Sequence, residues 1–335
     1  MQIYTNNCLC IKICKLYHFY DKSIEMNDIN TEITKTDYDN FSILHFQELS
    51  STQAFAKEII HGDLLHYSND LLFKLMNENK FLTIISDTQN SGVGQYGRSW
   101  VSPHGNLYMS CIVKLDKCDV INLTQVFALL VHDILLNDYG ILIQIKWIND
   151  ILYSSKQINS KKMGGIICEV CKLKDGKDML QSKDVLIVGI GININVATAD
   201  NSICMRDILK DTDNMIGQTN IIDKVSMVSK DGMHGKVNSG DQINIVGLAE
   251  KICHKLPKYL DQYYVGGIEV FIDKLNSNAA YINENVILYI RESEIKGIFK
   301  GYDKNGMIIL EYGNGVRESF HEGRMRLADS SDYIL

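Results

Sequence analysis

One glycine-rich segment limits the choice of fold more than any other part of the sequence. The string Gly92-Val-Gly94-Gln-Tyr-Gly97 follows the apolar run at 81–85 and fits the G-x-G-x-x-G pattern of dinucleotide-binding βαβ units. That pattern binds a pyrophosphate only where its third glycine opens a helix. Here Pro103 and Gly105 disfavour a helix, and a further apolar run begins at Leu107. The segment therefore predicts a loop between two strands and argues against a dinucleotide-binding fold.

The hydrophobic pattern elsewhere in the chain changes between strand and helix periods. Short strands with a few helices predict an α+β domain with a mixed or antiparallel sheet. Five short β runs after Val286, separated by turns rich in Gly, Asp and Asn, predict a small β-barrel near the C-terminus. We expect helices over about 52–60, 123–138, 248–264 and 268–275, and strands over 41–46, 81–85, 107–115, 141–147, 151–153, 162–169 and 185–194.

Charge and cysteine content exclude several classes of protein. The 335 residues carry a formal net charge of −7, which argues against a protein that grips nucleic acid non-specifically. No run approaches the length of a membrane-spanning helix, so we expect no membrane partner. Nine cysteines, an odd number, are spread along the chain and indicate a reducing, cytoplasmic location. Cys168 and Cys171 have no second Cys or His pair at zinc spacing nearby, and Cys168 lies in an apolar run where a strand would bury it, which argues against a metal site.

Two polar stretches interrupt the periodic pattern. Residues 1–40 are interpreted as an N-terminal extension, for which a leader and a disordered segment are the alternatives, and an organelle leader in the first 25 residues is left open. Residues 21–40 have the composition of a linker. Residues 197–245 lack a sustained period and predict a polar, partly disordered insertion.

Several short motifs contain residues that can bind an anion or a polar ring, and three of these motifs also contain glycine. Each alone has an ordinary interpretation, because a lysine after an apolar strand is commonly a surface residue. In order along the chain they are Ser51-Thr52, then Gln89-x-x-Gly92-x-Gly94-x-x-Gly97-Arg98-x-Trp100-x-Ser102-Pro103-x-Gly105-Asn106-Leu107-Tyr108, then Lys146-Trp147-x-Asn149-Asp150, then Lys162-x-Gly164-Gly165-Ile166, and then Gly189-Ile-Gly191-Ile-Asn193. This ordered set resembles the biotin protein ligases over about 45–195, weakly as far as 276, and again over 285–327.

The resemblance implies two domains. A catalytic domain similar to those of the class II aminoacyl-tRNA synthetases, with a mixed or antiparallel sheet and helices, would span 41–276. A small SH3-like β-barrel would span 282–328. The preceding 40 residues show no helix-turn-helix, so the resemblance is to ligases without a DNA-binding domain, and a repressor function is disfavoured.

The resemblance also implies an activity that uses biotin, ATP and Mg²⁺. The biotin carboxylate would attack the α-phosphate of ATP to give biotinyl-5′-AMP, and a lysine of a biotin carboxyl carrier domain would then accept the biotinyl group. Acetyl-CoA carboxylase is the expected source of the carrier, and a monomer or a homodimer without nucleic acid is the expected assembly. Because two anions must meet in the first step, the protein has to supply cations and N–H donors.

By this resemblance the site residues fall into three groups. The expected catalytic cations are Lys146 and Arg98. The expected biotin-binding residues, which include uncharged hydrogen-bonding groups suited to a ureido ring, are Ser51, Thr52, Gln53, Gln89, Gly92, Val93, Gly94, Gln95, Lys146, Gly164 and Gly165. The expected ATP-binding residues are Arg98, Trp100, Asn149, Asp150 and Asn193, with Asn193 also the expected Mg²⁺ ligand.

The chain departs from the family pattern at four positions. Val93 and Gln95 stand where the glycine loop usually carries arginine, which predicts that the adenylate is held less tightly and escapes more readily. Ile148 replaces the usual proline of the Lys-Trp-Pro-Asn-Asp motif, and Arg324 stands where glutamate is usual.

Two other functions are kept as alternatives. A lipoate or octanoate protein ligase shares the fold and the acylation of a lysine, but its typical Arg-Arg-x-x-Gly-Gly-Gly segment is absent from this sequence. A decayed ligase that binds biotin or the carrier without chemistry would account for Val93, Gln95 and Ile148. The presence of Lys146 and Arg98 argues against such a loss.

Overall fold

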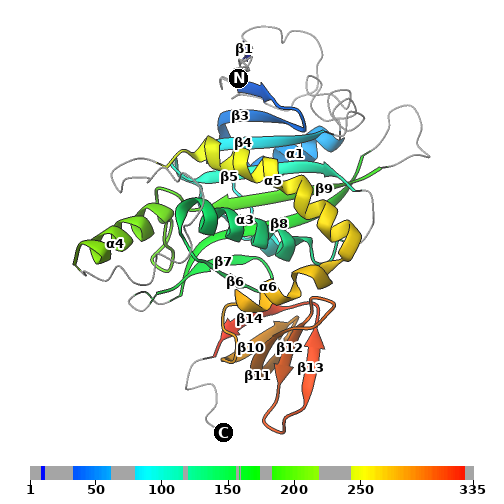
Figure 1. Cartoon of the computed structure of the whole chain (residues 1–335). Coiled ribbons are helices and arrows are strands. Elements are labelled where there is room, and N and C mark those ends of the chain that lie inside the picture. The colour runs from blue at the N-terminus through cyan, green and yellow to red at the C-terminus, as the bar shows by residue number, and fades with distance from the viewer. Residues whose placement is uncertain are drawn as a thin grey trace. The chain divides into compact units, whose positions relative to one another are not determined.

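Two compact units make up the chain, which is coloured from its N-terminus to its C-terminus in Figure 1. The first combines Met1–Cys118 with Ile167–Ile192, and the second combines Asp119–Ile166 with Asn193–Leu335. The structure is a computed structural model that describes residues 9–11, 33–61, 80–115, 120–155, 158, 160–173, 183–218 and 243–328.

The first unit is built on a mixed sheet. Strand β3 pairs in parallel with β4, whereas the other pairs whose register is resolved are antiparallel. The predicted mixed sheet is therefore confirmed. The strands follow the order β1-β2-β3-β4-β5-β9 and comprise β1 (Leu9–Ile11), β2 (Ile33–Asp37), β3 (Phe41–Leu49), β4 (Phe81–Gln89), β5 (Leu107–Lys114) and β9 (Lys183–Ile192).

Helix α1 (Thr52–His61) packs on this sheet and contacts β4, β5 and β9 (Figure 1). Phe55 and Ile59 lie one turn apart, as do Ala56 and Ile60, so the four side chains share one apolar face. All four are buried in the same core cluster as residues of β3 and β4. The predicted helix over 52–60 is confirmed.

The second unit contains a short antiparallel hairpin and most of the helices. Helix α3 is buried on nearly all sides, because its sequence is apolar almost throughout. It ends at Gly140, whose φ of 67° suits glycine. The elements are α3 (Leu123–Tyr139), β6 (Gln144–Lys146), β7 (Asp150–Tyr153), the first half of β8 (Lys161–Leu173), α4 (Met205–Gln218), α5 (Ile245–Gly266) and α6 (Ile272–Ser277), the last preceded by a 3₁₀ turn at Ile268–Phe271.

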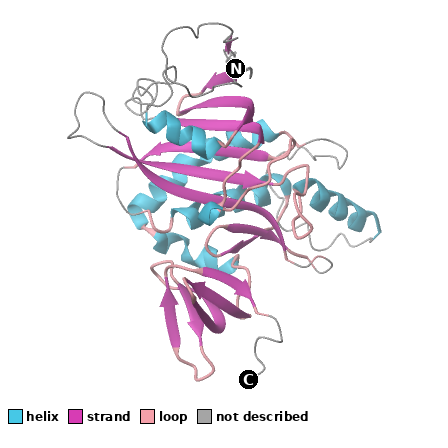
Figure 2. Ribbon diagram, turned by 180° about the vertical axis from the view of Figure 1, so that it is seen from behind, coloured by secondary structure: helices cyan, strands magenta, loops and turns pink. Residues whose placement is uncertain are grey.

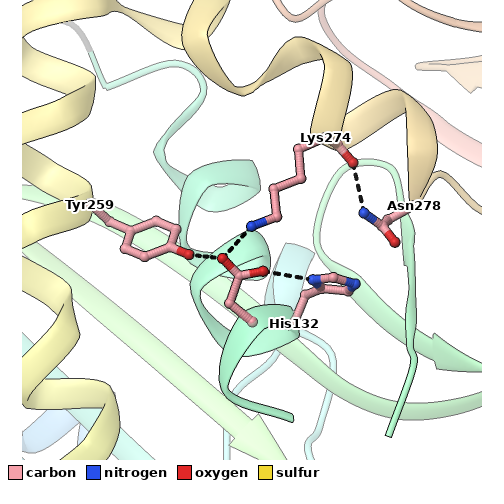
Figure 3. Close-up of polar contacts among 5 residues, drawn as sticks. His132, Tyr259, Lys274 and Asn278 are labelled. Carbon is pink, nitrogen blue, oxygen red and sulfur yellow. Dashed lines mark hydrogen bonds and ion pairs between the residues drawn. The ribbon is translucent and has the colours of Figure 1, made fainter. Parts of the chain in front are cut away.

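One half-buried carboxylate ties three helices of the second unit together (Figure 3). Asp133 of α3 accepts hydrogen bonds from the neighbouring His132 at 2.9 Å, from Tyr259 of α5 and from Lys274 of α6. Burial raises the pKa of Asp133, but hydrogen bonds from His132, Lys274 and Tyr259 outweigh burial and hold the pKa at about 2. Asp133 is therefore ionised at neutral pH and acts only as an acceptor.

The C-terminal part of the second unit is a five-stranded antiparallel sheet, the cluster of short strands nearest the C-terminus in Figure 2. Its strands follow the order β13-β12-β11-β10-β14, so the predicted five β runs are confirmed. They comprise β10 (Asn285–Ile290), β11 (Ser293–Tyr302), β12 (Ile308–Glu311), β13 (Arg317–Phe320) and β14 (Arg324–Leu327).

Carboxamide side chains join this sheet to the helices that precede it. Asn122 and Gln125, at the start of α3, donate to the carbonyls of Asn305 and Gly306 at 3.0 and 3.1 Å. A Cβ on Gly306 would lie 2.7 Å from Asn122 Oδ1, so only glycine fits this turn.

The structure differs from the sequence-based expectation in two stretches. Residues 33–37 of the predicted linker form β2, which pairs with β3 although its sequence is polar. Residues 205–218 of the predicted polar insertion form α4, whose residues Met205 and Ile208 are buried. The predicted extension and insertion also include residues 1–8, 12–32 and 219–242, which lie outside the described residues. In the part that is described, no helix combines the length and apolarity required to cross a membrane.

Candidate functional site

The glycine-rich segment forms a tight turn in the first unit. A 3₁₀ turn at Gln95–Gly97 reverses the chain, with positive φ angles of 58° at Tyr96 and 70° at Gly97. The N–H of Gly94 donates to the carbonyl of Arg98 at 2.7 Å and closes the turn. A short strand bridge and then β5 follow, without an intervening α-helix in this described segment, so the predicted loop is confirmed.

The base of this loop requires glycine at position 92. A Cβ on Gly92 would lie 2.4 Å from the carbonyl oxygen of Trp100 and 2.7 Å from Ser102 Oγ. The same atoms are hydrogen-bonded, because Gln89 Nε2 donates to Ser102 Oγ at 2.8 Å and Ser102 Oγ donates to the Trp100 carbonyl at 2.8 Å. The loop is therefore anchored on the end of β4 by a closely packed polar network.

The start of α1 joins this network. Gln89 Oε1 accepts the N–H of Thr52 at 2.8 Å, which brings together two predicted biotin-binding residues from distant parts of the chain. Ser51 Oγ accepts the N–H of Ala54 at 3.4 Å and so caps the helix. Ser51, Thr52 and Gln53 are each at most 4% exposed. Buried polar groups of this kind are normally fully hydrogen-bonded.

Ser110 is a member of the network that the sequence did not identify. It lies in β5 and is fully buried, with its hydroxyl 2.9 Å from Thr52 Oγ1 and 3.0 Å from Gln53 Oε1. In the sequence, Ser110 could have been noticed as a hydroxyl residue within the apolar run of β5. Gln53 Nε2 in turn donates to Glu169 Oε2 at 2.6 Å, and Lys57 pairs with Glu169 Oε1 at 2.8 Å.

The glycines of β9 allow two side chains to lie against its backbone. A Cβ on Gly191 would lie 2.8 Å from the indole of Trp100, and one on Gly189 would lie 2.6 Å from Gln53 Oε1. The expectation that these glycines permit a close approach to the strand is confirmed. Trp100 thus packs over β9 and holds the end of the glycine loop in place.

The tip of the loop is exposed. Val93 is 45% exposed and Tyr96 is 70% exposed. The exposed side chain of Arg98 donates through Nε to the carbonyl of Gln95 at 3.1 Å. A guanidinium has five N–H donors, so this bond leaves Arg98 able to bind an anion as well.

In the second unit, Lys146 ends β6 and pairs with a carboxylate across the hairpin. Its Nζ donates to Asp150 Oδ2 at 2.8 Å, and Lys162 Nζ lies 2.5 Å from Asp150 Oδ1. The side chains of Lys146 and Asp150 are 18% and 15% exposed. The peptide bond between Trp147 and Ile148, in the turn of the hairpin, is cis.

Asp150 carries its negative charge between two ammonium groups. Burial raises the pKa of its carboxyl, but the charges of Lys146 and Lys162 outweigh burial and lower the pKa below its ordinary value. The carboxylate therefore orients Lys146, and the three side chains together carry one net positive charge.

The remaining predicted residues of the second unit lie on or next to strands β7 and β8, and the N–H of Asn193 donates to the carbonyl of Met163 in β8 at 2.8 Å. Gly165 pairs with Asp150 across β7 and β8, and Gly164 is the preceding residue of β8. The backbone carbonyl of Asn149 accepts a hydrogen bond from β8. Asn193 is 1% exposed, and among the described residues its Oδ1 has no hydrogen-bond partner.

Comparison with known proteins agrees with this arrangement of motifs. Residues 61–193 match the model of the biotin/lipoate A/B protein ligase family. The bifunctional ligase/repressor BirA of Bacillus subtilis is 27% identical over 274 residues, which cover 80% of this chain and 74% of the relative. A biotin--[acetyl-CoA-carboxylase] ligase of Paracoccus denitrificans is 26% identical, with 68% of this chain and 82% of the relative covered.

The chain is thus similar to biotin/lipoate A/B protein ligases over the segment that carries the motifs. Its fold also matches that of a solved biotin protein ligase from Aquifex aeolicus in complex with biotin and ATP, with a TM-score of 0.61 and 22% identity. The match covers 88% of this chain and all of the Aquifex chain. The fold match therefore extends through both the α+β part and the C-terminal sheet.

The residues that the structure describes do not form a metal centre from their own side chains. Those residues contain no group of three or more His, Cys, Asp or Glu side chains that could hold a metal ion. Cys168 and Cys171 lie on β8, and both side chains are half-buried.

Proposed function

We propose that this protein is an ATP-dependent biotin ligase that modifies a lysine of a biotin carboxyl carrier domain. The observation that carries the proposal is the Lys146–Asp150 pair, in which a partly buried carboxylate holds an ammonium at the end of a strand within the Lys-Trp-x-Asn-Asp motif. The name of the Paracoccus relative supports acetyl-CoA carboxylase as the source of the carrier.

The first step joins biotin to AMP. A carboxylate oxygen of biotin attacks the α-phosphorus of ATP, the bond to the β-phosphate oxygen breaks, and diphosphate leaves. Both reactants are anionic, so their approach depends on positive charge placed beforehand. Lys146 supplies that charge, and Asp150 keeps its ammonium from rotating freely. Arg98 is the second cation, on the nucleotide side.

The second step transfers the biotinyl group to the carrier. The neutral ε-amine of the carrier lysine attacks the carbonyl carbon of biotinyl-5′-AMP, an amide bond forms and AMP leaves. Because the mixed anhydride is already activated, the protein has only to position the amine.

Recognition of biotin is assigned to the network at the start of α1. Thr52 and Gln89 offer an uncharged hydroxyl and amide that match the carbonyl and two N–H groups of a ureido ring. A site built from buried hydrogen-bonding groups rejects analogues that cannot pair with them. Trp100, Asn149, Asp150 and Asn193 are assigned to ATP.

The residues present fit a magnesium ion that arrives with the nucleotide. Asn193 offers one buried amide oxygen without a partner among the described residues, whereas Asp150 is already paired with two lysines. Mg²⁺ commonly binds through one or two protein oxygens, with substrate phosphates and water completing its shell. When bound there, Mg²⁺ would neutralise charge on the phosphates of ATP.

The test is transfer of labelled biotin to a biotin carboxyl carrier domain with ATP and Mg²⁺. Lys146→Ala should lower the transfer rate about 100-fold or more, since it removes the charge that stabilises the transition state. Lys258→Ala, which removes an exposed lysine of α5, is the matched control and should behave as wild type. Full activity of Lys146→Ala would refute the assignment, and transfer of lipoate or octanoate in place of biotin would refute the proposed substrate.

A further inference from the structure

The short strand that carries Lys146 is held along both of its edges within the second unit. Strand β6 pairs with β7 along one edge. Along the other edge, the backbone of Ile145 bonds twice to the chain that follows α6. Its N–H donates to the carbonyl of Asn278 at 2.7 Å, and its carbonyl accepts the N–H of Ala280 at 2.9 Å. The position of the residue directly before Lys146 therefore depends on the segment 278–280.

One side chain ties that segment to α6. Asn278 lies at the C-terminal end of α6, and its Nδ2 donates to the carbonyl of Lys274 at 2.9 Å. This carbonyl belongs to the last turn of the helix, where carbonyls lack a helical N–H partner. The bond therefore fixes the end of α6 to the chain that pairs with β6.

The side chain of Lys274 is bonded as well, so this residue is held both at its carbonyl and at its ammonium (Figure 3). Its Nζ donates to the carboxylate of Asp133 in α3, which also accepts from Tyr259 and His132. The side chains of Lys274 and Asp133 are 42% and 15% exposed. From the helix to the strand, one continuous connection within the second unit comprises Asp133, Lys274, Asn278, Ile145 and Lys146.

We propose that Lys274 is a positioning residue for the ammonium of Lys146. It acts through Asn278 and the backbone of β6, and it takes no part at the reacting atoms. While Asp133 holds Lys274, the end of α6 stays in place, and with it the backbone that precedes Lys146. Such precision matters because a displacement of about 1 Å can lower a rate about 100-fold. The inference rests on the proposed function, in which Lys146 supplies positive charge for the first step.

The first test measures the formation of biotinyl-5′-AMP in a single turnover of the full chain with labelled biotin, ATP and Mg²⁺. Lys274→Met keeps an unbranched apolar stem but removes the ammonium, and we expect the rate to fall about tenfold. Transfer from added biotinyl-5′-AMP to the carrier should stay within about twofold of wild type, because that step depends on placement of the amine. Circular dichroism ensures that both proteins are folded in the assay, so a lower stability alone would not separate the two steps. Lys274→Arg restores a cation that can reach Asp133 and should recover the first step to within about threefold.

Hydrogen exchange tests the connection without using the reaction. The N–H of Ile145 is protected by the carbonyl of Asn278, so the peptide that covers β6 should exchange at least about threefold faster in Lys274→Met, as measured by mass spectrometry. Asn278→Ala removes the side-chain bond to the carbonyl of Lys274 and should show both the slower first step and the faster exchange. This variant also decides the question if Lys274→Met does not fold.

Lys251→Met is the matched control. Lys251 of α5 is 45% exposed and pairs with Asp138 of α3 at 2.8 Å, so this variant also breaks an ion pair on α3, but one outside the connection to β6. It should form biotinyl-5′-AMP and exchange the N–H of Ile145 as wild type does. A wild-type rate or unchanged exchange in Lys274→Met would overturn the inference, as would equal losses in Lys251→Met. Failure of the wild-type chain to form biotinyl-5′-AMP would instead refute the proposed function, whereas the exchange of β6 would still test the connection, so the two failures are distinguishable.

Discussion

Replacement of Asp150 by asparagine tests the charge arrangement on which the proposed chemistry depends. Two unit charges 2.8 Å apart, the separation of Lys146 Nζ and Asp150 Oδ2, attract by roughly 6 kcal/mol at an effective dielectric constant of about 20. Removing one partner of a buried ion pair typically costs about 3–5 kcal/mol. Because Lys146 and Lys162 are 18% and 33% exposed, both can turn partly toward water. We therefore expect Asp150→Asn to lower the free energy of unfolding by about 3 kcal/mol at pH 7.

Urea unfolding followed by circular dichroism measures this loss. Glu311→Gln removes a carboxylate from an exposed ion pair and should change the free energy of unfolding by less than about 0.5 kcal/mol. The folded-state pKa of Asp150 is lower than its ordinary value of 3.8, so its stabilisation is fully present above that pH. Below it, wild type and Asp150→Asn should converge as the pH falls through the folded-state pKa. A difference under 0.5 kcal/mol at pH 7, on the order of an exposed pair, would refute the reasoning.

Two further predictions concern buried contacts within single units. Asp133→Asn should lower the free energy of unfolding by about 1–2 kcal/mol at pH 7 in urea titrations, because a pKa held near 2 instead of 3.8 corresponds to stabilisation of that order in a half-buried group. The difference should shrink as the pH falls from 3.8 toward about 2, and a pH-independent difference would contradict the ionic role. Gly191→Ala should displace the Trp100 indole and lower the free energy of unfolding by about 1–3 kcal/mol. In a Trp147→Phe background, the displacement should shift the fluorescence of Trp100. Gly313→Ala is the control, because a Cβ there meets nothing within 4 Å, and an unshifted spectrum of Gly191→Ala would show that the indole does not depend on Gly191.

Long apolar segments explain why much of the secondary structure was predictable. The apolar run at 81–85 and the helical period at 123–138 leave one choice of element each, and both elements form as expected. Helix α5 forms as expected around Pro257, since its buried face repeats with a helical period on both sides of the proline.

Elements that depend on a distant partner were not predictable. Strand β2 has a polar sequence and gains its order by pairing with β3, which no local pattern reveals. Helix α4 has a mostly polar sequence, and its residues Met205 and Ile208 are buried. Tertiary contacts override weak local preference in both cases.

The site residues also divide into those that a sequence motif reveals and those that only the folded chain brings together. The motifs in the sequence were enough to indicate a resemblance to the biotin protein ligases, because five motifs in one order are far more specific than any one of them. It could not reveal Ser110 or Glu169, since an isolated serine in a strand and an isolated glutamate carry no local signature.

The sequence alone thus determined the elements with strong periods and the residue types available for chemistry, because both depend on neighbours a few positions away. The tertiary structure decided which of those residues meet and in which direction their protons point. Hydrogen bonds act over about 3 Å between residues that are often dozens of positions apart, so only the folded chain defines them.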